Sequence, residues 1–246
     1  MNTESQHTLI AFATHWGSKF GGINSFNADL VAALGLAFYR SMRVICVVLD
    51  ADEADVAKAL HNHQVTVLSL GRKNDSAFSS DFLGEAEVLL SKCGCTLGAE
   101  TVCLGHDRIT GEIALSTAKK IGGRSALIHH MSYADYETFA EGAEKAREKE
   151  GEQEALFLKG DVLFAVGPVL RNALQDMVEH AVTMLIPGLH EIDAAAAPST
   201  FTGFLSGRIN EKTHRIKQAH LGVAGFARAT ARANTELHLP ESLKSS

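Results

Sequence analysis

Short apolar runs rich in β-branched residues alternate with longer amphipathic stretches along most of the chain. The run 8–14 (TLIAFAT) hardly alternates in polarity, which is typical of a strand buried on both faces. After it, Leu30, Leu34 and Phe38 recur at the spacing of one helical face. The same apolar character predicts further strands over 43–49, 65–70, 100–104, 125–129, 161–166 and 182–186.

Amphipathic stretches between these runs predict the helices. Thr110 stands where it can cap a helix that Gly122-Gly123 ends, and Pro168 stands where a first-turn proline belongs. The stretch 137–159 contains EGAEKAREKEGEQE and is expected to be a solvated surface helix. The other predicted helices cover 52–60, 81–92 and 110–121.

Strands spaced by helices of this length imply βαβ units with right-handed crossovers. The expected fold is therefore α/β, a Rossmann-like doubly wound parallel sheet over residues 1–193. Residues 194–200, with four alanines before Pro198, are the expected linker. Residues 201–246 hold one strand candidate, 202–206, and one helix candidate, 213–232. They are expected to start an incomplete second domain or to form a C-terminal docking segment.

Composition narrows the class of protein. The chain has 246 residues, 46% of them hydrophobic, and a formal net charge of −6 at pH 7. No apolar run reaches the roughly 20 residues that a membrane span needs, and the polar N-terminus lacks a signal pattern. The negative charge argues against a nucleic-acid partner. The four cysteines suggest no disulfide framework, so a cytoplasmic location is expected.

Several common site motifs are absent from the sequence. It contains no GxxxxGK[ST] phosphate loop, no GxGxxG fingerprint, no GxSxG elbow and no HExxH metal motif. Asp50 ends the second predicted strand, where a nicotinamide-dependent dehydrogenase places a ribose-binding acid. That interpretation rests on Asp50 and the sheet alone.

Three loops remain as candidates, because ligands of open parallel sheets bind at the carboxyl ends of the strands. The loop 14–27 is rich in glycine, and Gly21 and Gly22 would let an anion approach the backbone at a helix N-terminus. The loop 105–111 (GHDRITG) brings a histidine and an aspartate to the same edge. The loop 129–133 (HHMSY) adds two histidines that can act as bases or hydrogen-bond donors near neutral pH.

In this order, the segments resemble the N-terminal, acceptor-side domain of retaining glycosyltransferases of the GT-B fold, the glycogen-synthase-like or family 4-like group. The loop 17–27 is similar to the first loop of that group. His106-Asp107 with Gly111 resembles its HDxxxG segment after the fourth strand. The similarity extends over most of residues 8–232.

Two further segments carry the resemblance, each with one departure. His129 with Tyr133 resembles the family's HNxxY segment, although His130 stands where the family usually has Asn. The segment 161–170 resembles a strand, Ser and helix segment in which Gly167 replaces the usual Ser.

The C-terminal segment 204–217 (FLSGRINEKTHRIK) looks like the first strand and loop of the donor-binding domain of this group. There an Arg and a Lys hold the pyrophosphate of the donor. Arg208 matches the Arg, while Lys212 or Lys217 matches the Lys, and the spacing does not decide between them. The rest of that domain, with its carboxylate pair, does not follow, so the chain alone is expected to be inactive, and the sequence leaves open whether the native chain continues past Ser246.

The resemblance implies a role for each of these residues. His129 would be catalytic and would contact the donor sugar near the reacting centre. No metal and no cofactor is expected, since the nucleotide-sugar is a co-substrate. The implied acceptor-binding residues are His106, Asp107, His130 and Tyr133. The implied donor phosphate-binding residues are Gly21, Gly22, Arg208 and Lys217.

Two functions therefore stand side by side. The first is a glycosyltransferase half that moves a sugar from a nucleotide-sugar donor to an acceptor with retention. The alternative is a non-catalytic sugar- or nucleotide-binding module that kept the fold without the donor domain. The alternative predicts an apolar surface on the helix 213–232, through which the chain would form a homodimer. Turnover distinguishes the two.

Overall fold

The computed structural model describes residues 7–17, 20–72, 78, 82–94, 97–133, 143–186, 201–204 and 235–238. The chain divides into two units, one of Met1–Tyr133 with Glu148–Pro187 and one of Ala134–Arg147 with Gly188–Ser246. The predicted linker 194–200 and the predicted helix 213–232 lie outside the described residues. The predicted domain boundary stays a prediction.

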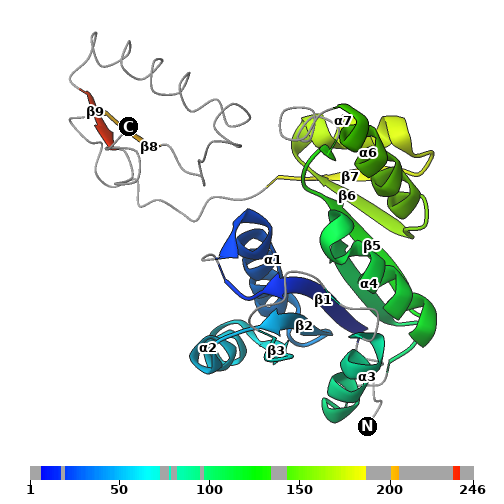
Figure 1. The fold of residues 1–246 in the computed structure, drawn as a ribbon. Coiled ribbons are helices and arrows are strands. Elements are labelled where there is room, and N and C mark those ends of the chain that lie inside the picture. Colours follow the sequence, from blue (N-terminus) through cyan, green and yellow to red (C-terminus); the bar gives the residue numbers. More distant parts are fainter. Residues whose placement is uncertain are drawn as a thin grey trace. The chain divides into compact units, whose positions relative to one another are not determined.

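The first unit is built on a seven-stranded sheet in which every neighbouring pair of strands is parallel (Figure 1). Its order is β3-β2-β1-β4-β5-β6-β7. Each predicted strand of this unit is found within two residues of its predicted ends, and the predicted Rossmann-like α/β fold is confirmed. The strands are β1 (His7–His15), β2 (Met42–Asp50), β3 (Val65–Ser69), β4 (Thr101–His106), β5 (Arg124–His129), β6 (Val162–Val166) and β7 (Val182–Leu185).

Helices cover both faces of this sheet, as Figure 1 shows. Alternate strand residues face opposite sides, and they fill two separate cores. One core joins the strands to α1 and α2 through Val31 and Ala59. The other joins them to α3, α4, α6 and α7, with Phe157 of α6 among its largest members. The helices are α1 (Gly22–Phe38), α2 (Glu53–His63), α3 (Phe82–Lys92), α4 (Asp107–Ile121), α6 (Ala143–Phe157) and α7 (Gly167–Met177).

The strand order reverses direction at β1. This strand lies between β2 and β4, so the chain builds the sheet outward first on one side and then on the other. A crevice forms at the carboxyl ends of the strands at such a switch point, and ligands bind there. The carboxyl ends of β1, β4 and β5 are therefore the edge at which a site is expected.

Two helices differ from prediction in ways that bear on this edge. The buried residues of α1 are Asn24, Asn27, Val31 and Gly35, whereas the side chain of Phe38 is 47% exposed. The predicted apolar face is thus wrong at Phe38, the last residue of α1, and the buried stripe includes two polar residues, Asn24 and Asn27. The helix α4 begins at Asp107 rather than after Thr110.

The prediction that Thr110 caps this helix is therefore also wrong. Thr110 lies inside the first turns of α4, and its Oγ1 accepts a hydrogen bond from the backbone N–H of His106 at 2.8 Å. The N-cap residue of α4 is His106, and its side chain makes no capping hydrogen bond. Gly122 does end α4, in the left-handed conformation that the Gly122-Gly123 pair predicts.

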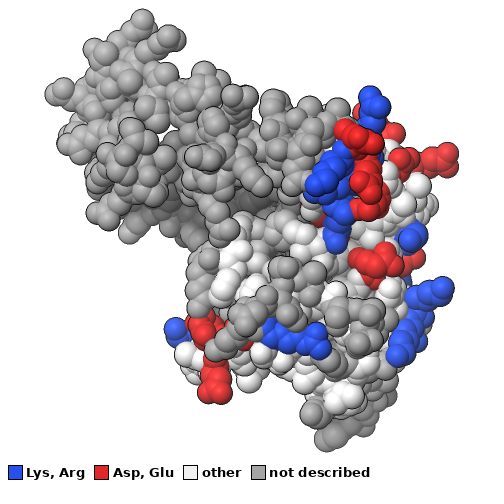
Figure 2. Space-filling model, in the orientation of Figure 1, with Lys and Arg blue, Asp and Glu red and all other residues white. Residues whose placement is uncertain are grey.

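The charged helix α6 is only partly the surface helix that its composition predicts. On the face shown in Figure 2, acidic and basic side chains gather together over α6. Its last two turns nevertheless bury Gln153, Leu156 and Phe157 against the sheet side of the first unit. The expectation of a solvated helix fails there, because this amphipathic face supplies part of a core.

The described part of the second unit contains two short strands. β8 (Phe201–Phe204) overlaps the predicted strand 202–206, and it pairs in parallel with β9 (Thr235–His238), which was not predicted. Across the described residues, none of the helices is long and apolar enough to cross a membrane.

Gly105, in β4 next to the site, gives the first testable prediction. A Cβ atom there would lie 2.6 Å from the carbonyl oxygen of Thr110 and 2.8 Å from Cα of Gly111. Backbone atoms cannot move aside cheaply, so Gly105→Ala is expected to lower the free energy of unfolding by about 1–3 kcal/mol in urea denaturation. The matched control is Gly151→Ala in α6, where a Cβ meets nothing within 4 Å and stability should stay equal or rise by up to about 1 kcal/mol. Equal losses in both variants would contradict the close packing of β4 on α4.

Candidate functional site

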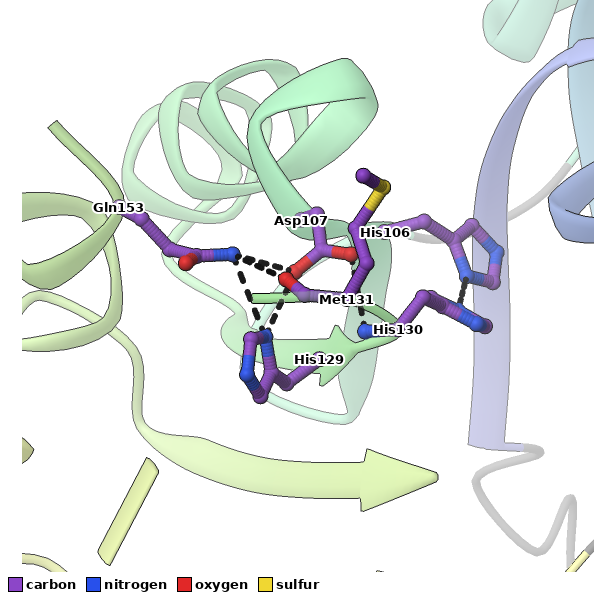
Figure 3. Close-up of polar contacts among 6 residues, drawn as sticks. All are labelled: His106, Asp107, His129, His130, Met131 and Gln153. Carbon is purple, nitrogen blue, oxygen red and sulfur yellow. Dashed lines mark hydrogen bonds and ion pairs between the residues drawn. The ribbon is translucent and has the colours of Figure 1, made fainter. Parts of the chain in front are cut away.

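Asp107 connects three elements at the carboxyl edge of the sheet. Its backbone has φ +43°, a left-handed conformation that Asp tolerates better than most residues. Its Oδ1 lies 2.9 Å from Nδ1 of His129, and its Oδ2 accepts the backbone N–H of His130 at 2.8 Å (Figure 3). Both the Asp107 and His129 side chains are fully buried. The start of α4 is thus bonded to the end of β5.

Gln153 extends this connection to α6. Its Nε2 donates to Oδ1 of Asp107 at 3.0 Å and to the carbonyl oxygen of Met131 at 3.1 Å, which uses both amide hydrogens. The same nitrogen lies 3.2 Å from Nδ1 of His129. The two nitrogens are this close because both donate to Oδ1 of Asp107. Within the described residues, neither Oε1 of Gln153 nor Nε2 of His129 has a hydrogen-bond partner.

A second chain of hydrogen bonds runs on the α1 side of the sheet. Nε2 of His106 lies 2.9 Å from Oδ1 of Asn27, and Nδ1 of His106 lies 2.9 Å from Nε2 of His130. Nδ2 of Asn27 donates a hydrogen bond to Sγ of Cys46 at 3.3 Å, and this bond orients the side-chain amide of Asn27. Phe26 packs edge-on against the ring of His130, with centroids 4.8 Å apart. This chain therefore links α1, β4 and β5.

Burial keeps the histidines of the second chain neutral. Desolvation lowers the pKa of His106 to about 3, and the neighbouring His130 adds to this effect. Desolvation also lowers the pKa of His130 to about 4, with His129 adding and the Asp107 carboxylate opposing. At neutral pH each ring thus carries one proton and one lone pair.

Arg108 fastens α6 to the loop after β5. Its guanidinium forms an ion pair with Glu152 and lies over the ring of Tyr133, with Cζ 5.1 Å from the ring centroid. Tyr133 is buried under this contact. The Arg108 contacts lie beside the Gln153 contacts, so two neighbouring residues of α6 hold the same loop.

Asn24 shapes the loop between β1 and α1. Its Oδ1 accepts the backbone N–H of His15 at 3.1 Å, and its Nδ2 donates to Oγ1 of Thr14 at 2.9 Å and to the carbonyl oxygen of Phe20 at 3.2 Å. The rings of His15 and Phe20 stack at 4.2 Å. Gly21, at φ +107°, caps α1 in a conformation that glycine adopts readily.

The structure brings the predicted residues of β4 and β5 together. Of these, His106, Asp107, His129 and Tyr133 are buried and His130 is partly exposed. Gly21 and Gly22 lie at the N-terminus of the helix that carries Asn27. Arg208, Lys212 and Lys217 lie outside the described residues. The roles assigned to all these residues stay predictions.

Sequence reasoning missed three residues that organise the site. Asn24 and Asn27 carry a usable signal, because two asparagines three residues apart interrupt the apolar positions of a helix that follows a glycine-rich loop. Gln153 carries no such signal, since it stands within a run of charged residues. In the part of the chain that the structure describes, no three His, Cys, Asp or Glu side chains form a group that could hold a metal ion.

The fold and this edge together define a Rossmann-like protein with a polar cluster at its switch point. Residues 10–240 match the sequence model of a family described as "Family 4 Glycosyltransferase in conflict systems". The match spans most of the chain, so the chain belongs to this family of glycosyltransferases, and the predicted resemblance to the family 4-like group is confirmed. A search among curated proteins gave no match.

The lowered pKa values of His106 and His130 predict a loss of stability in acid. A folded pKa below the unfolded value of 6.5 means that the unfolded chain binds protons first as the pH falls. Stability is therefore full above about pH 6.5 and decreases from there toward the folded pKa values. The buried His106 alone should account for about 2 kcal/mol of loss between pH 7 and pH 5.

The measurement is urea denaturation at both pH values. His106→Gln, which cannot titrate in this range, should lose less stability over the interval than the wild-type chain. His61→Gln replaces an exposed histidine of α2 and should keep the wild-type difference. An identical pH dependence in all three proteins would show that His106 does not titrate as its burial requires.

Proposed function

We propose that this family 4 glycosyltransferase domain takes part in transferring a sugar from a nucleotide-sugar donor to an acceptor hydroxyl with retention at the anomeric carbon. The observation that carries the proposal is the polar cluster of His106, Asp107, His129 and His130 at the carboxyl ends of β4 and β5, next to the switch point. In open parallel sheets this edge is the ligand-binding edge. The family match supports sugar chemistry there.

In the proposed reaction, the bond between the anomeric carbon and the diphosphate breaks, and its electron pair leaves with the phosphate oxygen. The acceptor hydroxyl forms the new bond on the same face of the sugar, and its proton passes to the departing phosphate oxygen. The histidine cluster positions a hydrogen-bonding group for the sugar at this edge. The resemblance assigns contact with the donor sugar to His129, and acceptor contacts to His106, Asp107, His130 and Tyr133.

The donor diphosphate is proposed to lie against the N-terminus of α1. Gly21 and Gly22 have no heavy atom within 4 Å of an added Cβ, so the backbone there faces open space. N–H groups at the start of a helix stabilise a bound anion and the charge that develops on a leaving phosphate. Arg208 and Lys217, or Lys212 in its place, would supply the cationic side of the same phosphate site.

The transfer itself is tested on the native gene product with UDP-glucose and GDP-mannose as probes. Release of nucleoside diphosphate together with a product that keeps the anomeric configuration, followed by NMR, is expected with a suitable acceptor. Binding of a nucleotide-sugar without any turnover would favour the non-catalytic binding module. Absence of both binding and turnover would reject the proposal for these donors.

The phosphate contact is tested separately by Gly21→Ala. An L-residue at φ +107° and ψ 172° costs about 1–3 kcal/mol, so the loop is expected to shift and to bind UDP roughly five- to 150-fold more weakly in calorimetry. Gly122→Ala is the matched control, because Gly122 also has positive φ and open space but caps the far end of α4. Equal affinities of the two variants would exclude the loop from the phosphate site.

A further inference from the structure

The two adjacent histidines at the end of β5 lie in different surroundings. His129 follows Leu127 on the sheet face that α4 and α6 cover, and its buried ring packs edge-on against Phe157 with centroids 5.4 Å apart. His130 lies on the α1 side with Phe26 and is partly exposed. Figure 3 shows the two rings pointing away from each other. Of the pair, His130 is the one that a ligand can reach.

The second hydrogen-bond chain determines where His130 carries its proton. Oδ1 of Asn27 can only accept, so Nε2 of His106 donates to it. The neutral His106 then has its lone pair on Nδ1, which accepts the N–H at Nε2 of His130. Nδ1 of His130 is left with a lone pair, and no partner for it occurs among the described residues.

This arrangement favours one kind of ligand group. A neutral nitrogen with a lone pair accepts a hydrogen bond from a hydroxyl, whereas it offers neither a donor nor a positive charge to a phosphate. The desolvated environment that lowers the pKa of His130 to about 4 keeps this acceptor unprotonated at neutral pH. The His130 ring is therefore suited to contact the sugar rather than the diphosphate of a bound nucleotide-sugar.

Buried hydrogen bonds to the backbone at and after His130 hold this residue in place. Oδ2 of Asp107 accepts the backbone N–H of His130, and Oδ1 is held by His129 and Gln153. Gln153 also bonds the carbonyl oxygen of Met131, the residue that follows His130. None of these groups needs to touch the ligand, because each acts on the backbone that carries His130.

We propose that His130, rather than His129, contacts the bound ligand, with Nδ1 accepting a hydrogen bond from a sugar hydroxyl. In this arrangement Asp107, His129 and Gln153 are positioning residues. The assignment rests on the proposed function for the sugar itself, whereas the difference in access between the two histidines is independent of it.

The direct test is NMR of the full chain labelled with ¹⁵N-histidine, titrated with UDP-glucose and, separately, with UDP. The Nδ1 signal of His130, identified by its loss in His130→Asn, is expected to shift with UDP-glucose and to stay in place with UDP. The signals of His129 should remain nearly constant in both titrations. A UDP-glucose shift confined to His129, or an equal shift of His130 with UDP alone, would overturn the assignment.

The positioning role of Gln153 is tested by a double-mutant cycle on UDP-glucose affinity. His130→Ala and Gln153→Leu are each expected to raise Kd, roughly three- to tenfold for the first. If Gln153 acts through His130, the double variant binds no more weakly than His130→Ala. Additive losses would overturn the role of Gln153. His61→Ala, an exposed histidine on α2, is the control and should bind as wild type.

Hydrogen exchange at the C2 carbon of each histidine, measured in the protein without ligand, tests the difference in access separately from the sugar contact. His130 should exchange much faster than His129, and the reverse order would overturn the assignment whatever the ligand. If His130 exchanges faster but neither UDP-glucose nor GDP-mannose binds, the proposed function and the sugar contact both fail for these donors. The difference in access between the histidines would then stand alone.

Discussion

The carboxylate of Asp107 is the group on which the site depends. Asp107 directly follows β4 and begins α4, and its carboxylate accepts hydrogen bonds from the side chain of His129, the backbone of His130 and the amide of Gln153. A buried carboxylate requires such partners, because an unpaired charge in a core is costly. Satisfying it fixes β4, β5 and α6 relative to one another within the first unit. The left-handed backbone at Asp107 turns the carboxylate toward these partners.

Much of the sheet could be predicted because its central strands β1, β2, β4 and β5 are buried on both faces. Runs such as 8–14 and 43–49 are apolar without alternation, and this pattern indicates a buried strand whatever the sequence of the neighbouring loops. The start of α4 could not be placed, since Asp107 adopts a conformation that propensity does not favour and Thr110 bonds backward to His106. The strand β9 was missed because its pairing with β8 joins distant segments.

The meeting of histidines at one edge could likewise be predicted, since parallel strands end together. Their different surroundings depend on which helix covers each face. Phe157 and Gln153 belong to a helix whose charges predict only solvent exposure, and the buried polar stripe of α1 is hidden among apolar residues. Local composition reports the average surroundings of a helix, whereas the site uses single residues that differ from that average.

The strand order also determines when the site can exist during folding. Thr8 of β1 pairs with Thr101 of β4, so the first strand waits for a distant segment before it has a neighbour on that side. Asp107 then lacks its amide donor until Gln153 is available. Contacts of such long range are slow to form. A nascent chain that has not yet presented α6 therefore has the strands of the ligand edge but lacks the Gln153 bonds that hold Asp107 and the backbone after His130.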